Sequence, residues 1–212
     1  MVRTVPTAVF VSGTGTNLQA LIEGVAAGDL PLDLRLVLSN NPHALALQRA
    51  RAAGIPVEVQ AYARDRQSRS QYAEHLAERV RAHGARLVLL LGWMHVLAAE
   101  FLAWDFDVLN LHPAYLPEDP SADQVAFPDG TVTPVFRGAH ALRDAIAAGA
   151  THAGASLIRI TSEVDRGPVL ARKPMRLQPG EDEAAALQRL HAVEQAVVRE
   201  GVRRWLGERV AR

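Results

Sequence analysis

Two side chains that could do chemistry, Asn110 and His112, are separated by one residue in the stretch DVLNLHPAYLP. Alternate residues of a strand point to the same side, so this amide and this imidazole would face one spot. Such a pair can stabilise an oxyanion, and histidine also moves protons near neutral pH. A nearby carboxylate would keep the imidazole charged, and the stretch SEVDRGP offers Asp165. The chemistry indicated is acyl transfer without a covalent enzyme intermediate.

Other catalytic classes lack their motifs in this chain. A lone histidine at a strand end is more often structural, but its pairing with a carboxamide and a proline turn favours catalysis. The sequence has no G-x-S-x-G, so a serine hydrolase is not expected. It also has no H-E-x-x-H and no cysteine, and its other histidines are scattered, so no metal site is expected.

A second candidate is the loop SGTGTN (residues 12–17), which follows a strand and opens a helix. Glycines let a backbone approach a ligand, and N–H groups at a helix N-terminus favour an anion such as phosphate. The dinucleotide pattern G-x-G-x-x-G fails at Leu18, and no Lys-Ser/Thr follows as in a Walker loop. The loop suits a single phosphate on a small ligand. An ordinary glycine turn with threonine and asparagine caps is the other interpretation.

The elements that must position these residues alternate between strand and helix through about residue 112. This alternation predicts an α/β fold with an open, mostly parallel twisted sheet and helices on both faces. Ser68 and Gln71 form a capping box for one of the helices. GASLIRI and GPVLARKPMRL follow with no helix between them, which predicts an antiparallel extension. A final helix is expected from about residue 181 to 205.

A single domain is expected over residues 1–212. One segment within it, residues 118–135, does not fit the pattern of strands and helices. It is rich in proline and longer than most loops, and such loops are often functional or disordered. VAFPDGTVTPVF could form a hairpin turned at Pro128, Asp129 and Gly130. The segment is either a lid or a solvated excursion.

Composition and charge limit the classes of protein to which the chain can belong. The chain has 212 residues, of which 49% are hydrophobic and 22% charged, so it can bury a core. Lys+Arg and Asp+Glu number 23 each, and this balance counts against a nucleic-acid partner. The N-terminus does not match a signal peptide, and no apolar run approaches the roughly 20 residues that span a membrane. A cytoplasmic protein with no membrane partner is expected.

Several segments together resemble one family in order along nearly the whole chain. They are SGTGTNLQALIE, LVLSNNPHALALQRARAAGIPV, LLLGWMHVL, VLNLHPAYLP, GAHALRDAIAAG and EVDRGPVL. The combination resembles the phosphoribosylglycinamide formyltransferases, and the N-x-H-P and D-x-G-P pair is shared with the wider folate-dependent group. The resemblance leaves out the insert at residues 118–135. It implies formyl transfer from 10-formyltetrahydrofolate to the amine of glycinamide ribonucleotide in purine biosynthesis, and leaves a homodimer open.

The resemblance also assigns roles to individual residues. It implies that His112 is a general acid and oxyanion stabiliser, that Asp165 keeps it protonated, and that Asn110 orients the formyl oxygen. It implies that Gly15, Thr16 and Asn17 bind the phosphate of the substrate. It also implies that Glu194 binds the sugar of the substrate. Folate binding is implied for Arg69, Met94, His95, Val96, Leu97 and Asn110.

The chain departs from the family at a few places. Ile158 stands where the family often has histidine, His95 where it often has arginine, and His191 where it often has glutamine. These departures and the insert bear on the exact acceptor amine more than on the reaction type. The alternative function is a related formyl-group enzyme, either a sugar-amine N-formyltransferase or a formyltetrahydrofolate deformylase.

Overall fold

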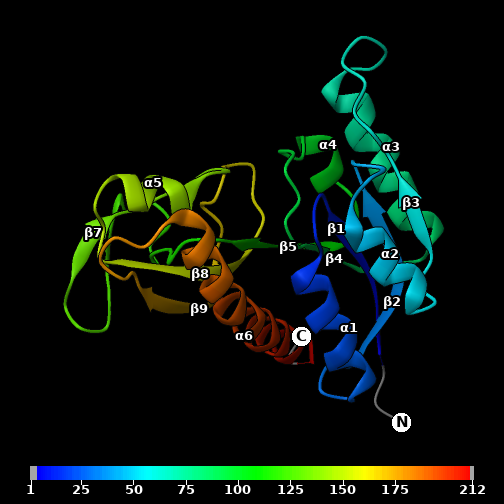
Figure 1. Ribbon diagram of the computed structural model, residues 1–212. Helices are drawn as coiled ribbons and strands as arrows, with labels where there is room; N and C mark the ends of the chain where they lie inside the picture. Colours follow the sequence, from blue (N-terminus) through cyan, green and yellow to red (C-terminus); the bar gives the residue numbers. More distant parts are fainter. Residues whose placement is uncertain (1–3, 211–212) are drawn as a thin grey trace. The chain divides into compact units, whose positions relative to one another are not determined.

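The computed structural model describes residues 4–210 (Figure 1), and these divide between Asn110 and Leu111 into two compact units. The ends of the predicted domain, residues 1–3 and 211–212, lie outside the described residues. That the two units act as one formyltransferase domain stays a prediction.

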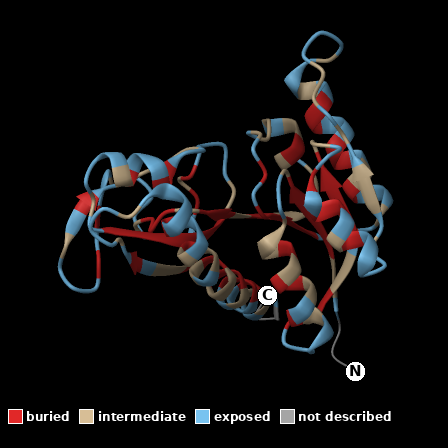
Figure 2. Cartoon of the chain, viewed as in Figure 1, coloured by how far each residue is buried: buried red, intermediate tan, exposed pale blue. Residues whose placement is uncertain are grey.

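The first unit is built on five parallel strands. Their order is β3-β2-β1-β4-β5, and β5 runs on by two residues into the second unit. They are β1 (Val5–Val11), β2 (Leu32–Ser39), β3 (Val57–Val59), β4 (Leu87–Leu90) and β5 (Asp107–His112). All four residues of β4 are buried, and Figure 2 shows the central strands of this unit as largely buried. Continuous apolar strands of this kind form where a parallel sheet is covered on both faces.

Four helices connect these strands. They are α1 (Thr16–Ala26), α2 (Leu45–Ala52), α3 (Arg69–Ala82) and α4 (Ala99–Leu102). Right-handed crossovers place α1 and α2 on one face of the sheet and α3 and α4 on the other, and the two members of each pair pack together. The predicted capping box is present, with Ser68 and Gln71 bonded to each other's backbone N–H groups. The single turn α4 was not predicted, because four residues carry no helical period.

The second unit holds the rest of the chain. Its elements are β6 (Gln124–Ala126), β7 (Val132–Pro134), α5 (Ala141–Ala147), β8 (His152–Arg159), β9 (Val169–Arg176) and α6 (Glu183–Val210). Strands β8 and β9 are antiparallel, and α6 packs on both of them (Figure 1). The predicted fold class, a mostly parallel α/β sheet with an antiparallel extension and a final helix, is therefore confirmed. That helix continues beyond its predicted end at residue 205. Within residues 4–210 no helix is long and apolar enough to cross a membrane.

The insert contains the predicted hairpin. Strands β6 and β7 pair antiparallel, with Val125 opposite Thr133, and the turn between them closes through a hydrogen bond from Phe127 N–H to Thr131 O. The ring of Phe127 is buried and stacks on Tyr115 at 4.8 Å between centroids. At the turn, Asp129 lies 3.0 Å from Nε2 of His152 on β8. The hairpin is thus packed onto the second unit and is not a solvated excursion.

Candidate functional site

His112 ends strand β5 with its imidazole buried beside a carboxylate. Nδ1 of His112 lies 3.4 Å from Oδ1 of Asp165, and both side chains are less than a tenth exposed. The two residues lie far apart in the sequence, so only the fold of the second unit brings them together. The pairing that the sequence could only suggest is present in the structure.

The second ring nitrogen of His112 also faces an acceptor. Nε2 lies 3.2 Å from the backbone oxygen of Phe136. Burial lowers the pKa of His112, while the Asp165 carboxylate and the Phe136 oxygen raise it and the charge of Arg137 lowers it further. The expected effect of Asp165 is therefore opposed by the larger effect of burial. The net direction of the pKa is downward, so the buried ring favours its neutral form.

The loop that carries Asp165 is tightly constrained. Asp165 has φ 53°, a left-handed conformation that residues other than glycine seldom adopt. Its Oδ2 accepts a hydrogen bond of 2.8 Å from the N–H of Gly138. A Cβ at Gly167 would lie 1.6 Å from the backbone oxygen of Arg159, so no larger residue fits there. The carboxylate is thus held by its backbone as well as by its partners.

Two further candidate residues lie on regular elements. Asn110 is on β5, two residues before His112, and is partly buried. Glu194 is on α6 and is buried. An ionisable side chain inside a helix face is seldom fully buried without a specific reason, which sets Glu194 apart from the other acidic residues of α6.

The glycine loop of the first unit is closely packed. Gly15 has φ 73° and precedes α1, and a Cβ there would lie 2.6 Å from Cβ of Ala46. The N–H of Ala46 donates to the oxygen of Gly13, and Arg49 donates to the oxygen of Thr14. The residue at the N-cap is Gly15, which has no side chain to cap the helix that begins with Thr16 and Asn17. This geometry suits a small anion at the helix N-terminus.

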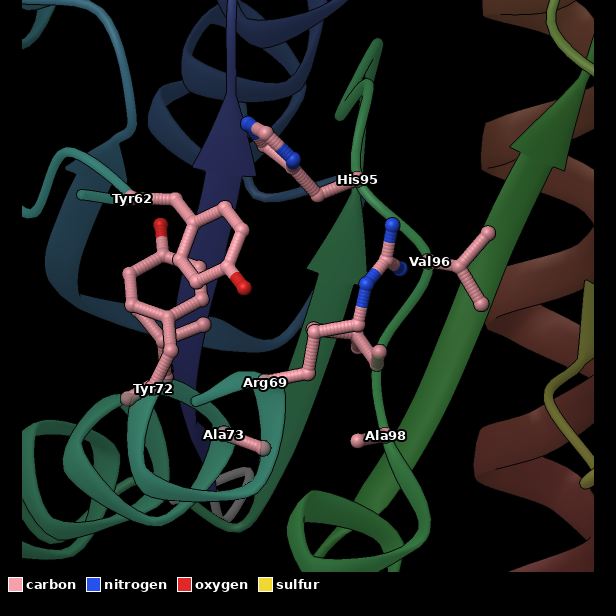
Figure 3. A pocket seen from close by; sticks show the side chains of 9 residues that line it. Tyr62, Arg69, Tyr72, Ala73, His95, Val96 and Ala98 are labelled. Carbon is pink, nitrogen blue, oxygen red and sulfur yellow. The ribbon is translucent and has the colours of Figure 1, made fainter. Parts of the chain in front are cut away.

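A hollow of about 290 Å³ lies elsewhere in the first unit, between α3 and the loop after β4. Its lining includes Arg69, His95, Val96 and Leu97, which were all predicted to bind folate. Figure 3 shows Arg69 reaching from the start of α3 toward the loop at Val96. Exposed Met94 adjoins this lining, and its N–H donates to Oγ of Ser12 at the glycine loop.

Aromatic rings on this hollow were missed by the sequence reasoning. Tyr62 and Tyr72 lie 5.1 Å apart between ring centroids, and His95 meets both edge-on (Figure 3). Burial lowers the pKa of His95, and the charges of Arg69 and Arg64 lower it further. Where the family often has an arginine, this chain thus places a ring that favours its neutral form. The two tyrosines could not be identified because single aromatic residues near helices are usually core residues.

In the second unit, sequence reasoning missed the segment after the insert. Phe136 and Gly138 contact His112 and Asp165 through backbone atoms, which no side-chain pattern reveals. Ile158, where the family often has histidine, is fully buried in an apolar cluster with Val135 and Phe136. In this chain the position therefore supports the segment that touches His112.

The sequence matches the formyl transferase family over residues 5–127 and 129–202. The chain belongs to this family, and the predicted resemblance is confirmed. Phosphoribosylglycinamide formyltransferase of Dictyostelium discoideum is 30% identical over 210 residues, covering 92% of this chain and 95% of that protein.

Two other proteins to which the chain is similar also have names from purine biosynthesis or glycinamide ribonucleotide formylation. The trifunctional purine biosynthetic protein adenosine-3 of Drosophila melanogaster is 35% identical over 190 residues, or 88% of this chain, and the chain spans 13% of that protein's length. The crystal structure of glycinamide ribonucleotide transformylase 1 from Symbiobacterium toebii is 30% identical, with a TM-score of 0.83, covering 96% of this chain and 88% of that one.

Proposed function

We propose that this protein transfers a formyl group from 10-formyltetrahydrofolate to the amine of glycinamide ribonucleotide, a step of purine biosynthesis. The observation that carries the proposal is the buried pair of His112 and Asp165 at the end of β5, in a chain that matches the formyl transferase family over most of its length. Relatives named for this activity support the choice of substrates.

Each substrate has candidate contacts. The loop at Gly15, Thr16 and Asn17 would hold the phosphate of glycinamide ribonucleotide, because a helix N-terminus and a close backbone favour an anion. Glu194 would bind the sugar of the same substrate. The hollow lined by Arg69 and residues 95–97 would hold the folate, with Met94 beside it. Tyr62 and the mostly buried Tyr72 line the same hollow and would give it an aromatic wall for a flat ring system.

The reacting atoms would meet Asn110 and His112. The neutral amine attacks the formyl carbon, a C–N bond forms, and negative charge grows on the formyl oxygen. The amide of Asn110 would donate to that oxygen, and the Nε2–H of His112 would do so in place of its contact with the Phe136 oxygen. The C–N bond to the folate then breaks, and the proton lost by the amine ends on the departing folate nitrogen. Asp165 would stabilise the charged imidazole while that proton is in transit.

The alternative formyl-group enzymes differ in their acceptor. Curated relatives and solved structures named for phosphoribosylglycinamide formyl transfer do not favour them. The test compares the rate at which the formyl donor is consumed under three conditions. These are glycinamide ribonucleotide as acceptor, an amino-sugar nucleotide as acceptor, and no acceptor. We expect consumption with glycinamide ribonucleotide alone. Consumption only with the amino sugar, or at an equal rate without acceptor, would refute the proposed acceptor.

The remaining parts of the proposal concern the co-substrate, the need for a metal, the cellular location and the oligomeric state. Formyl folate serves as co-substrate, and the chemistry above requires no metal. A cytoplasmic location and a homodimer stay predictions.

A further inference from the structure

The insert at residues 118–135 is fastened to two loops of the second unit. Oδ1 of Asp123 lies 3.0 Å from Nη2 of Arg166 and 3.3 Å from Nη1 of Arg137. The backbone oxygen of Pro120 accepts from both arginines, and that of Ala122 accepts from Arg137 at 2.7 Å. We call Asp123, Arg137 and Arg166 the insert clamp. It joins the insert to the two loops that carry Arg137 and Arg166.

The two arginines of the insert clamp are chain neighbours of the groups around His112. Arg137 stands between Phe136, whose oxygen faces Nε2 of His112, and Gly138, whose N–H donates to Asp165. Arg166 directly follows Asp165. Because consecutive Cα atoms are about 3.8 Å apart, a shift of either arginine's backbone moves a group that touches His112 or Asp165.

Asp165 needs such support. Its left-handed backbone is strained by about 1–3 kcal/mol, and such conformations persist only where the surroundings enforce them. On its far side the loop is fixed by Gly167, which lies against the backbone of Arg159. On its near side Thr161 bonds Glu163. The insert clamp adds a third attachment, directly at the residue after Asp165.

The charges make Asp123 central to this attachment. Arg137 is 17% exposed and Arg166 is 30% exposed, and both reach the same carboxylate oxygen and the same Pro120 oxygen. Without the carboxylate, two like charges would face one another beside the neutral backbone oxygens of Pro120 and Ala122. An exposed ion pair alone contributes little, but one carboxylate between two guanidinium groups also removes their repulsion.

We propose that Asp123 is a positioning residue that holds Arg137 and Arg166, and through them keeps the Phe136 oxygen, the Gly138 N–H and the Asp165 carboxylate aligned on His112. This inference rests on the proposed roles of His112 and Asp165. The insert clamp belongs to the second unit, whereas the residues proposed to bind the phosphate and the folate belong to the first. Its loss therefore acts on turnover and leaves the binding of both substrates unchanged.

The test compares kcat and both KM values for Asp123→Ala and Asp123→Glu with the unaltered protein. We expect Asp123→Ala to lower kcat about tenfold with each KM within about twofold, since small misplacements of catalytic groups act mainly on kcat. Asp123→Glu should recover most of the lost turnover. The matched control is Asp129→Asn, which frees the turn of the same hairpin from His152 and Arg176 and should leave kcat within about twofold.

A double-mutant cycle separates positioning from general destabilisation. In an Asp165→Asn background, Asp123→Ala should cause no further loss of single-turnover rate, because both changes disturb the same group. Additive losses would overturn the inference. Unchanged kcat in folded Asp123→Ala, with His112→Ala inactive, would overturn the inference and leave the proposed function standing. Full activity of His112→Ala would overturn the assigned roles and the inference with them.

Discussion

Asp165 holds His112 from a backbone conformation that few residues adopt. Its carboxylate lies 3.4 Å from Nδ1 of the ring, while its φ of 53° and its hydrogen bond from Gly138 fix where the carboxylate points. Strained backbone of this kind gathers at functional sites, where the surrounding structure enforces it. The relationship links the fold of the second unit to the proposed chemistry.

Removing either member of this pair should abolish most turnover. We expect His112→Ala and Asp165→Asn each to lower kcat by about 100- to 1000-fold, because one preorganised group in such a site contributes about 2.7–4 kcal/mol. Asparagine tolerates the left-handed backbone at 165, so the second variant keeps its fold. Steady-state kinetics of the purified variants check this. The control is His140→Ala, an exposed histidine before α5, which should match the unaltered protein.

Sequence predicted the chemistry at His112 but not its surroundings. Asn110 and His112 could be identified because the alternation of side chains along a strand is visible in a short stretch of sequence. The role of Asp165 could be assigned through the family resemblance. Phe136, Gly138 and Arg137 could not be identified, because they act through backbone atoms or through a carboxylate in an insert that the resemblance does not cover. Contacts of that kind depend on tertiary structure alone.

The glycine loop offers a paired test. Gly15→Ala should destabilise the protein by about 1–3 kcal/mol and raise KM for glycinamide ribonucleotide, because φ is 73° and the new Cβ would meet Ala46. Gly13→Ala, in the same loop, has nothing within 4 Å of its new Cβ and should change little. Thermal unfolding and KM are the measurements. Equal effects of the two substitutions would contradict the assigned packing.

Arg69 should matter for the formyl donor alone. We expect Arg69→Ala to raise KM for 10-formyltetrahydrofolate about tenfold, as loss of a hydrogen bond from a charged group does, with KM for the acceptor unchanged. Arg66→Ala is the matched control, since Arg66 is 84% exposed and pairs only weakly with its neighbour Asp65. If Arg69→Ala instead raised KM for the acceptor, the assignment of folate binding to this hollow would be wrong.

Acid should weaken the first unit through Glu58. Hydrogen bonds from Arg79 and His83 hold the pKa of Glu58 down to about 2. Because the folded-state pKa lies below that of the unfolded chain, this stability is present above about pH 4.5 and is lost as pH falls toward about 2. Solvent screening reduces its size to about 1–2 kcal/mol.

Glu58→Gln should therefore lower stability near neutral pH and flatten the loss of stability between about pH 4.5 and 2. Urea unfolding at several pH values measures both effects. Asp33→Asn, which breaks an exposed pair with Arg35 on β2, is the control and should change the unfolding free energy by less than about 0.5 kcal/mol. The same acid profile in Glu58→Gln as in the unaltered protein would show that the Glu58 pair does not govern this range.

The fold was more predictable than the insert. Alternating apolar strands and periodic helices identified the parallel sheet, since burial on both faces imposes that pattern on β4 and its neighbours. For the insert, sequence located the hairpin turn but could not separate a lid from a solvated excursion. Its attachment depends on Phe127 stacking on Tyr115 and on Asp123 reaching two distant arginines.

The most direct measurement follows the formyl group itself. Protein, glycinamide ribonucleotide and 10-formyltetrahydrofolate with an isotope-labelled formyl carbon are mixed, and the label is traced by NMR. We predict that the label moves to the terminal amine of the ribonucleotide, which becomes a formamide, and that His112→Ala leaves the label on the folate. Label released as free formate at the same rate with and without the ribonucleotide would contradict the account, because water would then be the acceptor.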